Sequence, residues 1–430
     1  MKIVLIGGGS YVFAPSVVED LMVKAKLSDF EFVLMDIDKE AAQVLAKIAQ
    51  RVAVDNALNV IVSATSNRLK ALENADYVIT SVAIQGAKRW LMDYEICMQE
   101  GIPFELRESG ALAGIIYGFR AITLLMDICR DMEKVCPNAK LLNVSNPLTK
   151  VHEAIYRFSG IEAYGFCNVA QRGAEGYEHI ARLLGMHHTE LEVVSAGLNH
   201  FSWITKITDK KTGRSMLSDY AEKYFQMNTN ESNVVYEWYK KFNAIIAPPI
   251  DHASDFLPYQ PNIHYVDTPP FHGSESERIQ RTEDMLKMAD GTVDYQTAGF
   301  FSNGSWEHPG LVAATLHTKG SMHIPVLNLP NKGCIPQLPT DAIVEVPVDI
   351  VDGVMSPYTN IVLPDAVVDY MQNQCLINRL VAEAAVEGDI EKAFDIIKED
   401  NAITHKVAAA KALKKMLTVH ADILPQFTHK

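Results

Sequence analysis

The stretch KIVLIGGGS at residues 2–10 decides the fold, because it reads as a buried strand that runs directly into a glycine-rich turn. The apolar spacing of APSVVEDLMVK at 14–24 predicts a helix after this turn, and FEFVLMDID at 30–38 predicts a second buried strand. In a βαβ unit of this kind the two strands lie parallel, because the helix carries the chain back across the sheet. The sequence therefore opens with the first unit of a parallel sheet.

Three later stretches predict further strands of the same sheet, and each is an apolar run that ends in polar residues. They are ADYVITSVA at 75–83, AKLLNVSNP at 139–147 and EAYGFCNVA at 162–170. The apolar spacing at 116–136 predicts a helix between the first two. Alternating strands and helices predict an α/β fold with a Rossmann-like, doubly wound parallel sheet, which we assign to an N-terminal domain at 1–190.

Residues 191–430 predict a C-terminal mixed α/β domain, to which we assign substrate binding and oligomerisation. LEVVSAGLNHFSWITKITDK at 191–210 is typical of a hairpin, and helices are expected from about residue 364. The stretch 248–275 is rich in Pro, His and Asp and has little periodicity. Long irregular stretches in a compact protein are more often functional than idle, so we expect part of the site there.

The composition is that of a folded protein with small partners. The chain has 430 residues, of which 48% are hydrophobic and 21% charged, enough for two or three domains. A formal net charge of -14 opposes binding to nucleic acid or anionic membranes, which require clustered positive charge. The first apolar run ends in glycines rather than a cleavage site, and six cysteines are too few for a disulfide framework. These features predict a cytoplasmic protein with no nucleic-acid or membrane partner.

The glycine-rich turn is the first candidate site. It consists of Gly7, Gly8, Gly9 and Ser10. Such a turn brings the backbone close to a pyrophosphate at a helix N-terminus, although Val12 replaces the third glycine of the dinucleotide fingerprint. Asp36, at the end of the second strand, would accept hydrogen bonds from ribose hydroxyls and repel a 2′-phosphate. The pattern predicts NAD rather than NADP.

Cys167 is the second candidate, because it ends a predicted strand at the edge where open parallel sheets bind ligands. Asn146, at the end of the preceding strand, should lie beside it, and His200 could close the site from the second domain. One thiol and one imidazole are too few for structural zinc, but they suit a metal completed by substrate oxygens and water. A buried core thiol and a nucleophile are the alternatives; the nucleophile needs an adjacent base that the sequence does not single out.

Five motifs in this order resemble glycoside hydrolase family 4, the NAD- and divalent-metal-dependent glycosidases, whose fold is similar to lactate and malate dehydrogenases. They are GGGS at 7–10, MDID at 35–38, NVSNP at 143–147, GFCNV at 165–169 and GLNHF at 197–201. The later IPQLPTDAIVEVPV at 335–348 resembles the family's C-terminal half. The resemblance implies a homodimer or homotetramer that acts on small glycosides.

The resemblance also implies residue roles and an unusual hydrolysis. Cys167 and His200 would bind a metal, usually manganese, while Asn146 and Asn168 would face the substrate. NAD would take a hydride from C3 of the sugar, and the metal would polarise the new ketone. A base would then remove the acidified C2 proton, the leaving group would depart by elimination, water would add, and the hydride would return.

The chain departs from the family pattern at several positions. Members that act on α-glycosides have a histidine or an aspartate after the cysteine, the aspartate serving as the acid for the leaving group, whereas Asn168 is similar to 6-phospho-β-glucosidases. The arginine that binds the phosphate in those members is replaced by Gln85, with Lys88 and Arg89 slightly later. The family's GPGG segment reads SGALAG at 109–114.

Four further residues are candidates near the substrate. Arg172 would bind a phosphate, carboxylate or sulfonate at C6, because its planar fork suits such groups; a solvated arginine at a helix start is the alternative. For the C2 base, Asp251 is the first candidate and Tyr259 the second, both in the irregular stretch, with His252 as a substrate contact.

Two other functions fit the same fold. A 2-hydroxy-acid dehydrogenase of the lactate or malate type would need an Asp–His proton relay and an arginine for the carboxylate, but not Cys167. A non-catalytic NAD-binding sensor would not need Cys167, Asn146 or His200. A metal requirement and turnover of a glycoside would separate these functions from a glycosidase.

Overall fold

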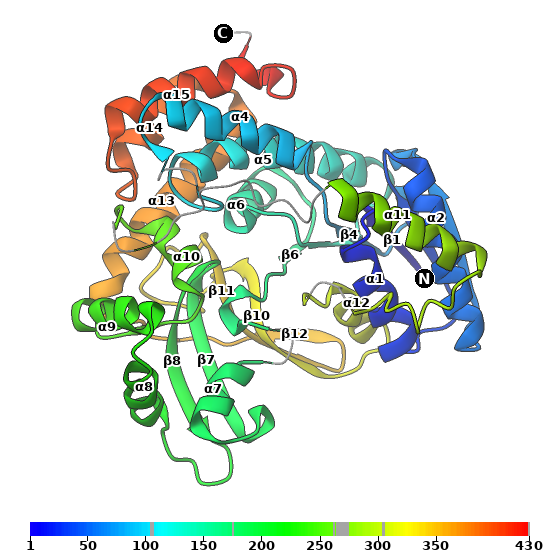
Figure 1. Cartoon of the computed structure of the whole chain (residues 1–430), viewed down its shortest axis with the longest axis horizontal. Helices are drawn as coiled ribbons and strands as arrows, with labels where there is room; N and C mark the ends of the chain where they lie inside the picture. Colours follow the sequence, from blue (N-terminus) through cyan, green and yellow to red (C-terminus); the bar gives the residue numbers. More distant parts are fainter. Residues whose placement is uncertain (104–106, 174–175, 261–262, 264–274, 303–305, 429–430) are drawn as a thin grey trace.

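One mixed sheet runs through both halves of the chain (Figure 1). The computed structural model describes residues 1–103, 107–173, 176–260, 263, 275–302 and 306–428. The strands are β1 (Lys2–Ile6), β2 (Phe30–Met35), β3 (Val60–Thr65), β4 (Tyr77–Thr80), β5 (Lys140–Asn143), β6 (Ala163–Gly165), β7 (Leu191–Leu198), β8 (Phe201–Asp209), β9 (Ile245–Ile246), β10 (Met322–Pro330), β11 (Ile343–Val351) and β12 (Val354–Pro357). Within the described residues they follow the order β3-β2-β1-β4-β5-β6-β10-β11-β7-β8-β9, with β12 paired to β11.

The first six strands are parallel and confirm the predicted Rossmann-like sheet. Their order, 3-2-1-4-5-6, is that of the doubly wound dinucleotide-binding fold. Both faces of β1 are covered, since Ile3 and Leu5 belong to one hydrophobic cluster and Val4 and Ile6 to another. Burial on both faces explains why this strand is an uninterrupted apolar run.

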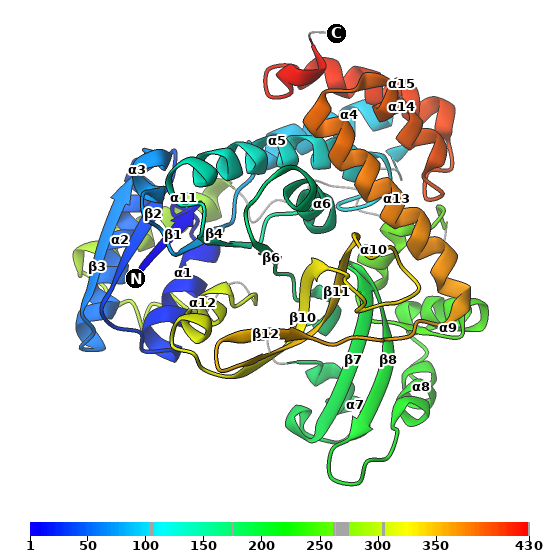
Figure 2. The ribbon, with the colours of Figure 1, turned by 180° about the vertical axis from the view of Figure 1, so that it is seen from behind.

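Helices cover the two faces of the sheet (Figure 2). They are α1 (Phe13–Val18), α2 (Lys39–Asp55), α3 (Arg68–Leu72), α4 (Gly86–Gln99), α5 (Ala111–Val135), α6 (Leu148–Phe158), α7 (Glu178–Leu184), α8 (Leu217–Gln226), α9 (Asn230–Phe242), α10 (Ile250–Ala253), α11 (Glu275–Asp290), α12 (Pro309–His317), α13 (Asp365–Glu387), α14 (Ile390–Glu399) and α15 (Lys406–Val419). The last three come from the second half of the chain, yet α13 packs on α5 and α6, and α15 packs on α4 and α5. The predicted division at residue 190 falls just before β7. Helices from beyond this division therefore cover part of the sheet that the residues before it form.

The helix α5 lies at the centre of this cover. In the described part of the chain it is long and apolar enough to cross a membrane by length and composition. Most of its apolar window is buried inside the protein, however, against α13, α6 and α15. This burial is typical of a core helix.

Antiparallel strands extend the sheet from β6 towards the predicted hairpin. Asn328 of β10 pairs with Gly165 of β6, and Glu345 of β11 pairs with Gly197 of β7. β7 and β8 form the hairpin, and its tip lies next to α10 (Figure 1). The hairpin tip is thereby brought back to the C-terminal end of β6.

A buried charge network ties the end of the chain to α5. The Asp93 carboxylate forms an ion pair with Arg120 (Oδ2 to Nη1, 2.8 Å) and meets His420 Nε2 at 2.7 Å. All three side chains are almost fully buried. Removal of one partner from such a network leaves an uncompensated buried charge.

We expect Asp93→Asn to lower the free energy of unfolding by about 3 kcal/mol, the range observed when one partner of a buried ion pair is removed. Urea unfolding followed by circular dichroism would measure the loss. Asp127→Asn is the matched control, because Asp127 pairs with Arg130 on the exposed side of α5 and should contribute under ~1 kcal/mol. Equal losses in the two variants would contradict the structural role of the network.

Candidate active site

The glycine-rich turn is built for close approach of the backbone. Gly7 has φ +92°, and a Cβ there would lie 2.1 Å from the carbonyl oxygen of Ser81. A Cβ on Gly8 would lie 2.8 Å from Leu34 Cβ, and one on Gly9 would lie 2.9 Å from Asp36 Oδ2. A side chain at any of these three glycines would therefore collide with neighbouring residues.

Two side chains fix the shape of the turn. The Asp36 carboxylate accepts hydrogen bonds from the backbone N–H of Gly9 (2.8 Å) and of Asp38 (3.0 Å). The Ser10 hydroxyl accepts one from the backbone N–H of Phe13 (3.2 Å), at the first residue of α1. Asp36 therefore lies directly beside the turn, where the sequence predicts contact with a ribose.

Cys167 and His200, predicted as a pair, lie together. Cys167 follows β6 and His200 stands at the tip of the β7–β8 hairpin, with Sγ and Nε2 3.4 Å apart. Both side chains are buried. The two residues are 33 positions apart in sequence, and the antiparallel extension of the sheet brings them together.

The environment disfavours charge on either group. Burial raises the pKa of the Cys167 thiol well above its usual value, and the carboxylates of Glu307 and Glu345 raise it further. Burial also lowers the pKa of His200 well below its usual value, with a further contribution from His252. A thiolate–imidazolium pair, which a cysteine nucleophile would need, is therefore opposed. A divalent cation would instead stabilise the thiolate and bind the neutral imidazole.

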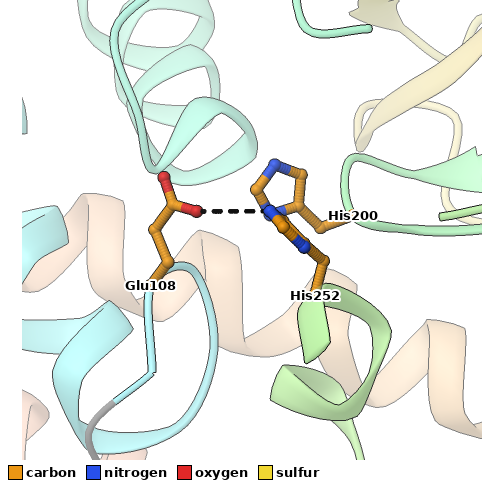
Figure 3. Close-up of side chains that lie close together, drawn as sticks. All are labelled: Glu108, His200 and His252. Atoms are coloured by element: carbon orange, nitrogen blue, oxygen red, sulfur yellow. Dashed lines mark ion pairs between the residues drawn. The ribbon is translucent and has the colours of Figure 1, made fainter. Parts of the chain in front are cut away.

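Glu108 joins this site without having been predicted. Ligand atoms of Glu108, His200 and His252 all lie within 4.8 Å of one another, and the three side chains point towards a common centre (Figure 3). Asn146, predicted beside Cys167, donates from Nδ2 to Glu108 Oε1 at 2.8 Å. Glu108 immediately precedes the SGALAG segment, and that position was the only signal in the sequence.

Asp251 and His252 form a bonded pair in the predicted irregular stretch. The His252 Nδ1 and the Asp251 Oδ1 are 2.8 Å apart, and the other ring nitrogen, Nε2, faces Glu108 Oε2 at 3.9 Å. The hydrogen bond to His252 lowers the pKa of Asp251. Tyr259 is half-buried, and its backbone N–H donates to Thr404 Oγ1 at 3.3 Å. Residues 261–262 and 264–274 of this stretch lie outside the described residues.

Asn168 directly follows Cys167 and contacts a distant segment of the chain. Its side-chain Nδ2 donates to the carbonyl oxygen of Trp306, and its backbone N–H donates to Glu307 Oε1 at 3.4 Å. The Trp306 side chain is 54% exposed. Asn168 therefore links the end of β6, next to Cys167, to the segment of Trp306 and Glu307.

The expectation that Arg172 binds an anionic substrate group is not supported by the geometry. Its guanidinium donates to the Glu231 carboxylate (2.5 Å), to Ala247 O (2.9 Å) and to Pro248 O (2.9 Å). Its charge is thus offset by a carboxylate, and its fork is occupied by backbone carbonyls. The partner that decides this, Glu231, is 59 residues away in sequence.

Arg89 also forms an ion pair with a carboxylate of the protein. It is buried, and its guanidinium donates to the Asp422 carboxylate, with Nη1 and Oδ1 2.8 Å apart. Lys88 is exposed at the start of α4. Of the two arginines considered for an anion at C6, neither therefore has a free guanidinium in the described structure.

Three buried ionisable residues around the site were missed. Lys150 Nζ donates to Ser109 O (2.7 Å) and Asn378 Oδ1 (3.0 Å), and burial lowers its pKa to about 8. Burial raises the pKa of Asp255 to about 6 and that of Glu345 to about 7. Their positions follow from long-range packing, so no local pattern marks them.

Comparison with known proteins gives a consistent result. Two models of one family match: Family 4 glycosyl hydrolase at residues 2–186 and Family 4 glycosyl hydrolase C-terminal domain at 195–403. An alpha-galactosidase of Rhizobium meliloti is 27% identical, with 100% of this chain and 90% of that protein covered. A probable 6-phospho-beta-glucosidase of Bacillus subtilis is 26% identical (100% and 98% covered), as is an alpha-galacturonidase of Bacillus subtilis (93% of each).

Solved structures agree in fold. A 6-phospho-alpha-glucosidase from gut microorganisms, in complex with NAD and glucose-6-phosphate, is similar with a TM-score of 0.80 at 23% identity, covering 99% of each chain. Another from the same source, with NAD and Mn2+, has a TM-score of 0.79 at 19% identity, again with 99% of each chain covered. Lactate dehydrogenase of Eimeria maxima shares the fold alone, at a TM-score of 0.51 and 15% identity, with 90% and 98% covered. Since the two family models together account for most of the sequence, the chain belongs to family 4 of the glycosyl hydrolases.

Proposed function

We propose that the protein hydrolyses small glycosides with the help of NAD and a divalent metal, Mn2+ being the first candidate. The observation that carries the proposal is the 3.4 Å contact between Cys167 Sγ and His200 Nε2, beside a sheet whose first turn suits a dinucleotide. The similar 6-phospho-alpha-glucosidases contain NAD, and one of them also Mn2+, which supports the assignment.

The turn fits the dinucleotide. A Cβ at Gly7 would overlap the carbonyl oxygen of Ser81, so only glycine allows the tight turn that such a fold uses to bring backbone N–H groups close to a pyrophosphate. Asp36 would hold the adenosine ribose, because its carboxylate already lies at the turn. Its negative charge disfavours a 2′-phosphate and supports NAD over NADP.

The Cys167–His200 pair fits a metal. A thiol and a neutral imidazole suit divalent transition metals. His200 Nδ1 and Asn146 Oδ1 are buried and have no hydrogen-bond partner among the described residues. Buried polar atoms without a partner call for an explanation, and a bound polar or charged group is one.

When bound, NAD would accept a hydride from C3 of the sugar, and the cation would act as a Lewis acid that makes the C2 proton removable. Asn146 and Asn168 would orient the sugar hydroxyls, because their amides border the site. Asp251 is engaged with His252, and its lowered pKa makes it a weak base. We therefore assign removal of the C2 proton to Tyr259 in preference to Asp251.

The charges around the site favour sugars that are neutral at C6. The carboxylates of Glu108 and Asp251 lie near the imidazole, while Arg172 and Arg89 are neutralised by their partners. A phosphate, uronate or sulfonate at C6 would be repelled unless exposed Lys88 contacts it. We also propose, as the family resemblance implies, a cytoplasmic homodimer or homotetramer.

A panel of nitrophenyl α- and β-glycosides, neutral, 6-phosphorylated, uronic and sulfonated, tests the function under reducing conditions. Cleavage should require both NAD and Mn2+, and neutral sugars should react best. Cleavage that is independent of NAD would contradict the redox mechanism, and a preference for the phosphorylated series would contradict the charge argument.

Cys167→Ser should raise the Kd for Mn2+ at least tenfold and lower activity, because a hydroxyl is a poorer ligand than a thiolate, while the fold stays intact. Isothermal titration with Mn2+ and thermal unfolding would measure both effects. Cys375→Ser, at a buried cysteine of α13 outside the site, is the control. Unchanged activity of Cys167→Ser at limiting Mn2+ would remove Cys167 from the site.

Asp36→Ser should shift the cofactor preference towards NADP by at least tenfold, because it removes the charge that repels the 2′-phosphate (about 1.4 kcal/mol per factor of ten). The Kd values of NADH and NADPH, measured by nicotinamide fluorescence, would report the change. Asp38→Ser, at an exposed carboxylate two residues further on, should have a smaller effect.

Tyr259→Phe should slow turnover by about 100-fold, the contribution typical of general base catalysis. It should also abolish exchange of the C2 proton with deuterium oxide, which NMR of the recovered substrate would show. Asp251→Asn should retain this exchange once Mn2+ is saturating. The reverse result would return the role of base to Asp251.

A further inference from the structure

We propose that Arg107 and Asp255 are positioning residues that hold two parts of the site together. One part is the loop that carries Glu108, and the other is the segment 250–259, which ends at Tyr259. The inference rests on the proposed function, because that function assigns removal of the C2 proton to Tyr259. It adds the contacts that fix the two parts relative to one another.

The side chain of Arg107 reaches from the first part into the second. Its Nη1 donates to the carbonyl oxygens of Ser254 (2.7 Å), Asp255 (3.1 Å) and Leu257 (2.9 Å). These carbonyl groups belong to the 3-10 turn Ser254–Phe256 and the residue after it. A basic side chain suits this position, because it can donate to several carbonyl groups at the end of a helical turn. Arg107 therefore holds the backbone of the second part.

Asp255 makes the reverse connection. Its Oδ2 accepts hydrogen bonds from the backbone N–H of Ser109 (2.8 Å) and of Gly110 (3.3 Å), which directly precede α5. A carboxylate is stabilised at the N-terminus of a helix by the partial positive charge there. Burial raises the pKa of Asp255 to about 6, and the Arg107 guanidinium opposes this rise. Each side chain thus binds the backbone of the other's segment, and together these contacts form a cross-link between the two parts.

Close approach of the two backbones explains the first glycine of the SGALAG segment at 109–114. A Cβ on Gly110 would lie 2.1 Å from the carbonyl oxygen of Asp255. The next residue, Ala111, has φ +49°, in the left-handed region that favours glycine. Strain of this kind persists where the surrounding structure enforces it and is concentrated at functional sites. The contact with Asp255 therefore requires glycine at position 110, and the chain beside it adopts a strained conformation.

Lys150 contacts both parts from a third element, α6. Its Nζ donates to the carbonyl oxygen of Ser109 at 2.7 Å and lies 5.8 Å from the centre of the Phe256 ring. Lys150, Arg107 and Asp255 are each no more than 4% exposed. Buried charges cost free energy unless they are paired and hydrogen-bonded. The two parts are therefore joined by buried charged groups with partners on both sides, rather than by an apolar contact alone.

The cross-link acts on the site through Glu108, which lies between Arg107 and Ser109 in the chain. Its Oε2 faces His252 Nε2 at 3.9 Å, and its side chain points towards His200 and His252 (Figure 3). Because the backbone on both sides of Glu108 is bound to the segment of His252, the distance between these two side chains is fixed. A displacement of about 1 Å in a catalytic site can cost on the order of 100-fold in rate. Loss of the cross-link should therefore lower kcat more than it raises KM.

Arg107→Met and Asp255→Asn should each lower kcat at least tenfold, while KM and the Kd of NADH change less than threefold. The rates are measured with the glycoside that the wild-type protein cleaves best, at saturating NAD and Mn2+. Arg107→Lys should recover much of the loss, because an ammonium group also offers three N–H donors to the same carbonyl groups. A kcat within twofold of wild type in both Arg107→Met and Asp255→Asn would overturn the proposal.

Arg120→Met and Asp93→Asn are the matched controls for stability. Their ion pair is buried to a similar extent, with Nη1 and Oδ2 2.8 Å apart, but it joins α4 to α5 rather than the two parts of the site. Both controls should lower Tm about as much as the test variants and leave kcat within twofold. An equal fall of kcat in test and control variants would assign the effect to stability alone and contradict the positioning role.

Hydrogen exchange of the full chain, without NAD, Mn2+ or sugar, tests the cross-link independently of activity. Arg107→Met and Asp255→Asn should each speed exchange at least tenfold on both sides, at residues 107–110 and 250–259, whereas Asp93→Asn should change neither. A measurement on the wild-type protein does not depend on whether the variants fold. The amides of Ser109 and Gly110 should exchange as slowly as those at the centre of α5, and rapid exchange there would contradict the cross-link.

The two proposals fail in different ways. If no glycoside of the panel is cleaved but exchange changes on both sides as described, the proposed function is wrong and the cross-link stands. If the wild-type protein cleaves a glycoside with NAD and Mn2+ and neither test variant loses kcat, the function stands and the positioning role is wrong.

Discussion

The buried carboxylate of Glu345 is the interaction on which the geometry of the site depends. It accepts hydrogen bonds from Asn199 Nδ2 (2.9 Å), Ser202 Oγ (3.0 Å) and Asn328 Nδ2 (3.1 Å). Two of these donors flank the hairpin tip, and the third lies on β10, opposite Gly165 at the end of β6. One side chain thus connects the strand that precedes Cys167 to the turn that carries His200. Burial of this carboxylate is costly, and the three donors offset the cost.

Much of the first half was predictable from the sequence, because its strands are buried on both faces and their apolar runs are unambiguous. The glycine turn, Asp36 and the hairpin follow from local patterns of this kind. β3 was not predicted, since this edge strand has an exposed Ile61 and alternating burial. The single sheet through both halves was not predicted either, because single bridges at Gly165 and Gly197 leave no local pattern.

Some residues of the site could be predicted from local motifs, and others are placed there only by contacts with distant parts of the chain. Cys167 and His200 could be paired because each sits in a short motif of unusual composition. Glu108 could not, since its position depends on the contacts of Arg107 and Ser109 with residues about 150 positions later. The ion pair of Arg172 could not be predicted for the corresponding reason, because its partner Glu231 belongs to a distant helix.

The cover formed by α13 and α15 on α5 has a consequence for synthesis of the chain. A nascent chain that has just completed β7 already contains α5, one of its most apolar helices, but the residues that bury one side of it have not been translated. Domains generally fold as units during synthesis, from the N-terminus onward. Here the dinucleotide-binding half must wait for the C-terminus with an apolar face exposed. The N-terminal half is therefore a poor choice for independent expression, because α5 would lack the helices that cover it.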